Sequence, residues 1–588
     1  MAPVSAHRSD VQAALLAMIY RYLPFLNWLR HYRREHLPSD VVAGIVTAIM
    51  LIPQSMAYAQ LAGLPPQIGL YASVAPLIVY ALLGTSGQLS VGPVAITSLL
   101  VFSGVSSLAE PGSARYIQLV LLLAFMVGAI KLAFGVLRLG SILNFISHPV
   151  LTAFTSASAL IIAVGQLKYI LGYRIGGEHI HETIGQAIAG LSQTNLVTLT
   201  IGLTSIGLLV FFRQGLRPLL RKLGLPPLAI TLIVSSAPLL TVILGILVAQ
   251  TFLLDQTAGI AVVGAIPAGL SPISVPAFSM ADAQALLPTA LTIVLVSVVE
   301  SIAVAKALAS KRRQAIDPDQ ELVALGAANI TASFFSGYPV TGGFSRSVVN
   351  AQAGAITGLA SLITALGIAV ILLFFTPVFY YLPQTVLAAT VIVAVIGLVD
   401  LREPHRIWRT NRGDAFTWLI TFLAVLSLGI ETGIFVGVAS ALVLYLWRTS
   451  RPHIAIVGRL GDSEVYRNVE RYQVKTWPYV VAVRVDESLY FANTRYLESA
   501  LLQIVAERPS VKHLVLIGSA INFIDSSALH TLEHLIDELR DAGVEFHLAD
   551  IKGPVMDRLK QSELIDKIGH DHIHLTTHTA MLALGCQD

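Results

Sequence analysis

Two polar, glycine-containing stretches interrupt long apolar regions of this chain, and their residue types suit the binding of an anion. The first is SGQLSVGPVA (Ser86 to Ala95) and the second is SFFSGYPVTGGFSR (Ser333 to Arg346). Non-helical backbone is tolerated in a bilayer only where it is buried in protein or lines a cavity, because each unsatisfied peptide group in hydrocarbon costs several kcal/mol. Paired breaks in corresponding halves of a membrane chain indicate a substrate site.

Each break contains residues that favour the start of a helix. Gly92 and Pro93 fit a first helical turn, where the missing proline N–H has no helical partner to lose. Gly342 and Gly343 allow close backbone approach, and Ser345 is expected to cap the helix that follows. If both N-termini face one point, free N–H groups and two dipole ends converge there, and an anion is the natural occupant.

Arg346 adds a full positive charge to the first turn after the second break. This charge makes binding of an oxyanion or a halide feasible without a metal ion. The alternative is that the glycines mark a kink or close packing and that Arg346 extends to an interface.

Glu300 places a carboxylate inside the apolar segment near 287–310, the eighth along the chain. A charge there is costly enough to be functional by default. We expect Arg346 to be its partner. An ionised Glu300 would oppose a second negative charge, and its protonation would relieve that repulsion, so proton and anion binding would be coupled. The alternative is a structural ion pair that does not titrate during transport.

Gln54 and Tyr58 lie four residues apart in the first apolar segment and therefore on one face of a helix. Either side chain could form a hydrogen bond to a neighbouring helix.

The composition is that of a polytopic membrane protein. The 588 residues are 55% hydrophobic and only 12% charged, about half the charged share of soluble domains. The net charge of +3 is too small to indicate a nucleic-acid partner, and the single Cys586 excludes an intrachain disulfide and a cysteine metal cluster. Arginines precede the first apolar segment without a cleavage-site pattern, so we expect no removable signal peptide and a cytoplasmic N-terminus.

Apolar stretches long enough to cross a bilayer number about fourteen if the two broken stretches count as partial spans. They lie near 40–62, 66–84, 88–107, 117–137, 149–171, 195–213, 226–250, 287–310, 320–337, 343–354, 356–376, 382–400, 414–430 and 431–447. Basic clusters after the sixth, eighth, twelfth and fourteenth segments would all be cytoplasmic, whereas the 251–286 connection has no Lys or Arg. Because seven is odd, a second set of seven would enter from the opposite side, giving an inverted repeat.

Four regions are expected along the chain. They are a cytoplasmic N-terminal segment (1–39), a transmembrane transport domain (40–447), a linker and entry strand (448–478), and an α/β domain (479–588). In the last region the predicted strands are Tyr479–Val485, Leu489–Asn493, His513–Ile517 and Val544–Ala549, and the predicted helices are Thr494–Glu507 and Ser526–Ala542.

Histidines recur at every second position near the C-terminus, at His570, His572 and His574. On a strand they would share one face. A solvated face is favoured over a metal site, because the sequence reveals no further ligand to complete a four-coordinate set. We therefore predict neither a metal nor a cofactor.

These residues resemble the SulP anion permeases, whose animal relatives include prestin and pendrin. The resemblance is carried, in family order, by IPQSMAYAQLAGLPPQIGLY (Ile52 to Tyr71), SVGPVA, ESIAVAKALA (Glu300 to Ala309), DQELVALGAANI (Asp319 to Ile330) and GGFSRSVVN (Gly342 to Asn350). The tail, with LYFAN and NFIDSSALHTLEHL (Asn522 to Leu535), is similar to the STAS domain that follows the last span in this family.

The resemblance implies a seven-plus-seven inverted repeat, with a core of spans 1–4 and 8–11 that moves against a gate of spans 5–7 and 12–14. It also implies homodimers. The expected substrate-binding residues are Gln54, Tyr58, Val94, Ala95, Phe344, Ser345 and Arg346, with Glu300 for proton coupling. In some members the acidic residue helps to hold sodium with a hydroxyl one turn later, but that position is Val304 here.

Asp525, Ser526 and Ser527 resemble the loop that is phosphorylated in bacterial anti-sigma-factor antagonists, and Ser527 matches the acceptor. The alternative is a simple helix cap by Asp525 or Ser526. A cytoplasmic protein partner of this domain is a further expectation.

The expected function is secondary active transport of sulfate by proton symport, through elevator-type alternating access, in a bacterial inner membrane with both termini cytoplasmic. Alternatives within the class are bicarbonate, a C4-dicarboxylate or chloride, moved by sodium coupling, exchange or a channel-like mode. A membrane-anchored anion sensor that acts through the STAS domain is the alternative outside it. An enzyme is not expected, because the sequence has no nucleophile–base pair, metal set or phosphate loop.

Overall fold

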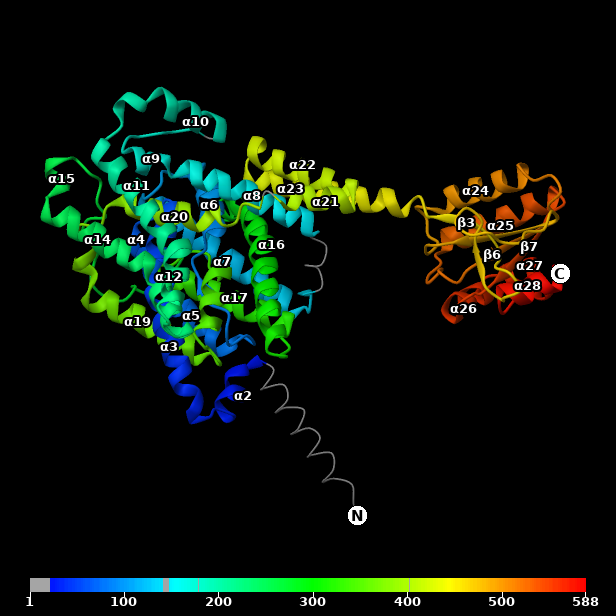
Figure 1. The fold of residues 1–588 in the computed structure, drawn as a ribbon, viewed down its shortest axis with the longest axis horizontal. Coiled ribbons are helices and arrows are strands. Elements are labelled where there is room, and N and C mark those ends of the chain that lie inside the picture. The colour runs from blue at the N-terminus through cyan, green and yellow to red at the C-terminus, as the bar shows by residue number, and fades with distance from the viewer. Residues whose placement is uncertain (1–21, 141–146, 178, 401, 588) are drawn as a thin grey trace, which may run out of the picture. The chain divides into compact units, whose positions relative to one another are not determined.

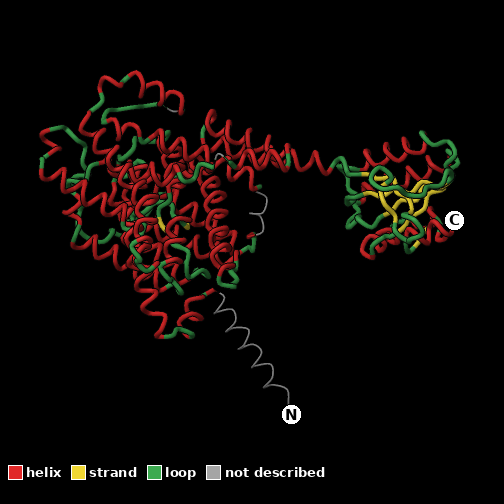
Figure 2. Tube along the Cα trace, in the orientation of Figure 1, coloured by secondary structure: helices red, strands yellow, loops and turns green. Residues whose placement is uncertain are grey.

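The computed structural model describes residues 22–140, 147–177, 179–400 and 402–587 of the chain (Figure 1). The chain divides into two compact units, one that ends at Ala441 and one that begins at Leu442. The described residues of the first unit form helices and two short strands, and the second unit contains a mixed sheet, drawn in yellow in Figure 2.

The described part of the first unit is built of helices, most of which lie in the apolar segments. They are α2 (Pro24–Arg30), η1 (Arg34–His36), α3 (Leu37–Leu61), α4 (Pro66–Tyr71), α5 (Ala75–Leu83), α6 (Ala95–Ser106), α7 (Ala114–Val136), α8 (His148–Gly165), α9 (Leu167–Leu171), α10 (Ile180–Ala189), η3 (Leu191–Gln193), α11 (Leu196–Val210), the π-helical turn η4 (Phe211–Leu216), α12 (Arg217–Lys222), α13 (Pro227–Ser235), α14 (Ala237–Thr251), α15 (Leu254–Thr257), α16 (Met280–Lys311), α17 (Pro318–Phe334), α18 (Phe344–Gln352), α19 (Leu359–Phe374), η5 (Thr376–Phe379), α20 (Gln384–Ile396), α21 (Glu403–Thr410), α22 (Arg412–Leu428) and α23 (Ile430–Thr449), which crosses the boundary between the units.

Each of the fourteen expected segments contains helix within the described residues. Seven helical stretches of the described residues are long and apolar enough to cross a membrane, with α4–α5, α8–α9 and α11–α12 each counted as one, and the bent pair α13–α14 could make an eighth. The other apolar helices are shorter. In particular, α6 and α18 begin only after the two breaks, so each is a half-helix that a non-helical stretch completes.

The two breaks pair with each other. Strand β1 (Val91–Gly92) runs antiparallel to β2 (Thr341–Gly342), with Val91 opposite Gly342 and Gly92 opposite Thr341. All four residues are buried. This two-stranded ribbon pairs backbone groups that would otherwise be unsatisfied at membrane depth, and it joins the two halves of the chain.

Helices α7 and α17 pack with their backbones in close contact. A Cβ on Gly128 of α7 would lie 2.6 Å from the amide nitrogen of Ile330, and one on Gly326 of α17 would lie 2.6 Å from that of Leu132. Small residues at such crossings let membrane helices approach and pack without a hydrophobic driving force. The side chain of Lys131 is fully buried on α7 in the same region.

The second unit is a six-stranded sheet with helices. Its elements are β3 (Ile454–Arg459), β4 (Tyr466–Asn468), β5 (Val480–Val485), α24 (Thr494–Ala506), β6 (His513–Ile517), α25 (Ser526–Asp541), β7 (Glu545–Ala549), α26 (Gly553–Gln561), α27 (Leu564–Ile568), η6 (His570–His572), β8 (Ile573–His574) and α28 (Thr577–Ala583). The order is β4-β3-β5-β6-β7-β8, parallel from β5 to β8.

Two predictions for this unit are wrong. Leu489–Asn493 is not a strand: Leu489 forms only an isolated bridge to Ile524, and a turn follows it. His570, His572 and His574 do not share a strand face, because His570–His572 is a 3-10 turn and only His574 lies in β8. Short apolar or alternating runs cannot distinguish a strand from a turn without knowledge of the neighbouring strand.

We predict that Gly128→Ala destabilises the membrane unit, because the new methyl group would meet the backbone nitrogen of Ile330. The expected loss is about 1–3 kcal/mol, the cost of overpacking a close-packed interior. Thermal unfolding in detergent, followed by size-exclusion fluorescence, measures it. Gly207→Ala on α11 is the control, since nothing lies within 4 Å of its new methyl group. Equal stability of the two variants would contradict the predicted close crossing.

Candidate functional site

The half-helices α6 and α18 begin next to each other, beside the β1–β2 ribbon. Helix α6 has Val94 as its N-cap and α18 has Gly343, and neither N-terminus receives a side-chain cap. The backbone joins the two starts, since the N–H of Gly343 donates to the carbonyl oxygen of Ser90 over 3.1 Å. Uncapped first-turn N–H groups and two helix dipoles therefore meet in one region, an arrangement that suits an anion.

Two predictions about these helix starts need correction. Gly92 and Pro93 do not form the first turn of α6: Gly92 pairs in β1, and Pro93 precedes the N-cap. Ser345 does not cap α18, because it lies inside the helix after the N-cap Gly343. Helix α6 therefore begins later than residue preferences alone indicate, and α18 begins earlier.

Polar side chains from surrounding helices hold the second break in position. The hydroxyl of Ser301 on α16 accepts the N–H of Gly342 at 3.0 Å and lies 2.6 Å from the hydroxyl of Thr341. Asn329 on α17 accepts the N–H of Val340 and donates to its carbonyl oxygen, both over 2.9 Å. The backbone of this break is thus satisfied inside protein, as membrane depth requires.

The first break is held by residues that follow the second. Ser347 on α18 accepts the N–H of Ser90 over 2.9 Å, and Asn350 donates to the carbonyl oxygen of Gln88 over 3.0 Å. The sequence interpretation did not assign Ser301, Asn329, Ser347 or Asn350. Their signal is the recurrence of small polar and amide residues within otherwise apolar helices.

Arg346 lies between the two breaks and is 2% exposed. Its guanidinium donates to the carbonyl oxygen of Pro93 over 2.5 Å and reaches that of Ser90 at 3.5 Å. A Cβ on Gly343 would lie 3.0 Å from the guanidinium carbon, so glycine leaves room for this arginine. Arg346 therefore links the breaks and places its positive charge beside both helix starts.

Glu300 lies on α16, directly before Ser301, and its Oε2 is buried without a hydrogen-bond partner. The expected direct contact with Arg346 is absent from these described residues, because the guanidinium is directed to the carbonyl oxygens of the first break. The two side chains are nevertheless close enough for their charges to interact through space. Val304, one turn later, is buried and has no side-chain oxygen.

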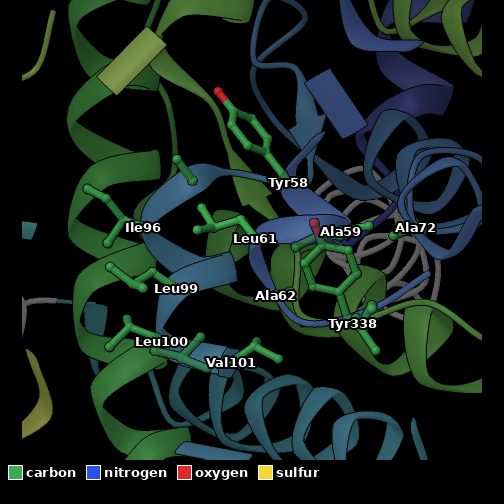
Figure 3. Close-up of a cluster of buried hydrophobic side chains, with 14 of the residues drawn as sticks. Tyr58, Ala59, Leu61, Ala62, Ala72, Ile96, Leu99, Leu100, Val101 and Tyr338 are labelled. Atoms are coloured by element: carbon green, nitrogen blue, oxygen red, sulfur yellow. The ribbon is translucent and has the colours of Figure 1, made fainter. Parts of the chain in front are cut away.

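Two further candidate residues lie on α3. Gln54 and Tyr58 on α3 are each 8% exposed, and Tyr58 is within electrostatic range of Arg346 and Glu300. Figure 3 shows Tyr58 with Tyr338 of the second break among apolar side chains of α3 and α6. The hydroxyl of Tyr338 lies 3.0 Å from that of Ser98 on α6.

The residues at the helix starts differ in exposure. Val94 and Ala95 at the start of α6 are buried, whereas Phe344 and Ser345 at the start of α18 are exposed. Phe344 is 55% exposed, although it follows directly on the buried ribbon. The α18 side of the arrangement is thus the more open one.

Two buried carboxylates that the sequence interpretation missed fix the loops next to the half-helices. Glu321, on α17, accepts the N–H groups of Thr85 and Ser86 at 2.7 and 3.1 Å, the Thr85 hydroxyl at 2.6 Å and the Tyr80 hydroxyl at 2.8 Å. In the sequence, Glu321 stands out as an acidic residue in the first turn of an apolar helix. Its partner Tyr80 is far away in the sequence.

Asp40, on α3, uses the same kinds of donor. It accepts the N–H groups of Ile356 and Thr357 at 2.7 and 3.1 Å, the Thr357 hydroxyl at 2.7 Å and the Tyr32 hydroxyl at 3.3 Å. Each carboxylate therefore holds two consecutive N–H groups, a threonine and a tyrosine, one before α6 and the other after α18. Charged acceptors strengthen such bonds roughly twofold.

In the second unit, Asp525 is the N-cap of α25. Its carboxylate accepts the N–H of Ala528 at 2.8 Å and that of Phe491 at 2.9 Å. The interpretation of this segment as a helix cap is confirmed for Asp525. Ser527 is exposed in the first turn of the same helix.

Broken helices that meet inside a polytopic helical unit define the class of membrane proteins built around a binding site at mid-membrane. The comparisons agree with this class. A family model described as the sulfate permease family matches residues 37–421, and a STAS domain model matches residues 471–580.

Relatives and solved structures extend the similarity over most of the chain. "Sulfate transporter 4.1, chloroplastic" of Arabidopsis thaliana is 38% identical over 580 residues, which cover 96% of this chain and 83% of that protein. A protein of Mycobacterium tuberculosis named as a probable sulfate transporter is 34% identical over 565 residues, which cover 96% of this chain and 98% of that protein. The murine Solute Carrier 26 family member A9 anion transporter, in the inward-facing state, has the same fold with a TM-score of 0.88 at 24% identity, over 97% of this chain and 95% of that one.

The chain therefore belongs to the sulfate permease family, and it carries a STAS domain after its membrane unit. The resemblance stated from the motifs is confirmed. So is the helical polytopic fold with a C-terminal α/β domain. The family is one of transporters and not of enzymes.

We predict that Glu321→Gln destabilises the membrane unit by roughly 1.5–3 kcal/mol, because an amide cannot accept the four hydrogen bonds as a carboxylate does. Thermal unfolding in detergent measures the loss. The matched control is Glu110→Gln, in an exposed loop, which should unfold like the wild type. A wild-type unfolding temperature for Glu321→Gln would show that Glu321 does not hold the loop before α6.

Proposed function

We propose that this protein is a secondary active transporter that carries sulfate across a membrane. The observation that supports this most is the meeting of two uncapped half-helix N-termini at the β1–β2 ribbon, with the buried Arg346 between them. A doubly charged oxyanion can accept hydrogen bonds from both sets of N–H groups and interact with the guanidinium. The names of the relatives favour sulfate over other small anions.

Proton symport is the proposed coupling. Glu300 is near enough to Arg346 for charge interaction, and its Oε2 is buried without a partner. A sulfate that binds beside an ionised Glu300 is repelled, whereas a proton on Glu300 removes that repulsion. Binding of the proton and the anion is then mutually favourable, and this coupling is reciprocal.

The proposed movement is an elevator-type displacement of a core against a gate. Helix α17 packs against α7 and α5, and α3 packs against α19, so these pairs lie within the proposed core of spans 1–4 and 8–11. In the proposed gate, α11 packs against α20 and α22 against α8. Both breaks and the network around them belong to the core, so the site could move as one body.

The remaining proposals concern context. We propose a bacterial inner membrane as the location. We also propose that both termini are cytoplasmic, because that orientation places the basic clusters on the cytoplasmic side.

A homodimer, a cytoplasmic partner of the STAS domain and phosphorylation of Ser527 are further proposals. The exposure of Ser527 in the first turn of α25 is compatible with the last of these, since a phosphate is favourable at a helix N-terminus.

We predict that an imposed inward proton gradient drives accumulation of labelled sulfate in proteoliposomes, and that Glu300→Gln abolishes this drive while sulfate exchange continues. The amide cannot release a proton, so it leaves the site permanently relieved of the repulsion. Glu110→Gln should behave like the wild type. Accumulation that persists in Glu300→Gln would contradict proton coupling through Glu300, and a wild type that moves neither sulfate nor the competitors bicarbonate, fumarate and chloride would favour the sensor alternative.

We also predict that Arg346→Gln reduces sulfate uptake at least tenfold, since it removes the charge between the two helix starts and a charged hydrogen bond of about 1.5–3 kcal/mol. Uptake over a range of sulfate concentrations measures the effect. Arg448→Gln, at the exposed end of α23, serves as the control for loss of one positive charge. Uptake by Arg346→Gln within twofold of that by the control would contradict a direct role of Arg346.

A further inference from the structure

Three neighbouring strands of the second unit bring histidines together from distant parts of the sequence. His513 begins β6 opposite Glu545 of β7, and His547 follows two residues after Glu545 on the same face. On the other side of β7, His574 of β8 pairs with Ala549. The side chains of His513, Glu545, His547 and His574 therefore lie on one face of the sheet.

The potential ligand atoms of three of these residues lie within contact distance of one another. His513 Nδ1 is 3.2 Å from His547 Nε2 and 3.1 Å from a carboxylate oxygen of Glu545, and that same oxygen is 3.9 Å from His547 Nε2. In a tetrahedral zinc site with ligands at about 2.0–2.1 Å, two ligand atoms are about 3.3 Å apart. Two of the three separations, 3.1 and 3.2 Å, are thus close to the edge of a coordination tetrahedron, and the third, 3.9 Å, is longer.

The surroundings of His547 suit a metal ligand. Its second nitrogen, Nδ1, lies 3.4 Å from His574 Nε2, so a neighbour can fix the orientation of the ring, as partners of metal-bound histidines commonly do. The ring of His572 lies 4.4 Å from that of His547, centroid to centroid.

The three potential ligands differ in their exposure to solvent. His547 is 3% exposed, whereas the side chain of Glu545 is 59% exposed and that of His513 is 23% exposed. A cation could therefore arrive from solvent at Glu545 and His513 and reach the buried nitrogen of His547.

We propose that the STAS domain holds a divalent transition-metal cation, bound by His513, Glu545 and His547, with His574 positioning His547. Two nitrogens and one carboxylate oxygen are a ligand set of the kind that zinc accepts, and the ion would cross-link β6 and β7. The histidine repeat near the C-terminus contributes His574. The proposed ligands lie in β6 and β7, at least 27 residues before His574 in the chain. This inference is independent of which anion the membrane unit carries.

A second histidine pair supplies the control. His530 and His534 on α25 are exposed, and their Nε2 atoms lie 3.2 Å apart. A pair of exposed histidines one helical turn apart can bind metal weakly by itself, so it must be removed separately. His530→Gln does this without touching the cluster on the sheet.

The experiment uses the full-length protein in detergent, without a polyhistidine tag and after treatment with a chelator. Zinc binding is measured by calorimetry, and cobalt is added in parallel because its visible absorption reports coordination number. We expect one zinc per chain in the wild type and in His530→Gln, with cobalt bands of four-coordinate intensity. His513→Gln and Glu545→Gln should each weaken zinc binding at least tenfold, and circular dichroism establishes that both variants are folded.

Several results would overturn the proposal. They are no zinc binding by the wild type, loss of binding in His530→Gln, and wild-type binding in both His513→Gln and Glu545→Gln. Cobalt spectra of six-coordinate type would contradict the tetrahedral arrangement. If both variants unfold, a rise in the unfolding temperature of the wild type on addition of zinc, retained in His530→Gln, still supports the site, and its absence overturns it.

Discussion

The membrane unit depends on one constraint, that its two non-helical breaks satisfy their backbone groups away from water. The β1–β2 ribbon meets this constraint by pairing Val91 and Gly92 with Gly342 and Thr341, which lie about 250 residues further along the chain. The pairing also brings the starts of α6 and α18 together. The feature that makes the breaks tolerable is therefore the same feature that creates a candidate anion site, and neither half of the chain can build it alone.

Polar side chains around the ribbon also form hydrogen bonds to backbone groups of the breaks. Ser301, Asn329 and Ser347 each accept a backbone N–H of a break, while Glu321 and Asp40 fix the loops outside it. Because hydrogen bonds to charged acceptors are strong at low dielectric, the two carboxylates restrict the loops without adding free charge at the site. Arg346 is different, since its partners are neutral carbonyl oxygens and its charge is left for a ligand.

The sequence was sufficient for the overall fold and for the position of the two breaks, and insufficient for the contacts around them. Apolar runs predict the spans because bilayer thickness imposes a length, and Gly342 and Gly343 mark a break because helices rarely tolerate such pairs. The contact of Arg346 with Pro93 depends on a ribbon two residues long in each strand, which no periodicity can predict. Ser345 was expected as a cap because residue preference favours serine there, whereas the N-cap is Gly343, directly after a ribbon that is itself a long-range feature. The meeting of His513 with His547 likewise follows from the order of parallel strands and from no local pattern.

The most direct test of the central claim is a structure of the protein bound to selenate, a heavier analogue of sulfate, with the anion located by its anomalous scattering. The account predicts one selenate between the starts of α6 and α18, with oxygens about 2.7–3.2 Å from first-turn N–H groups of both helices and beside the guanidinium of Arg346. Selenate bound elsewhere in the membrane unit, or absent from this position at concentrations that saturate transport, would contradict it.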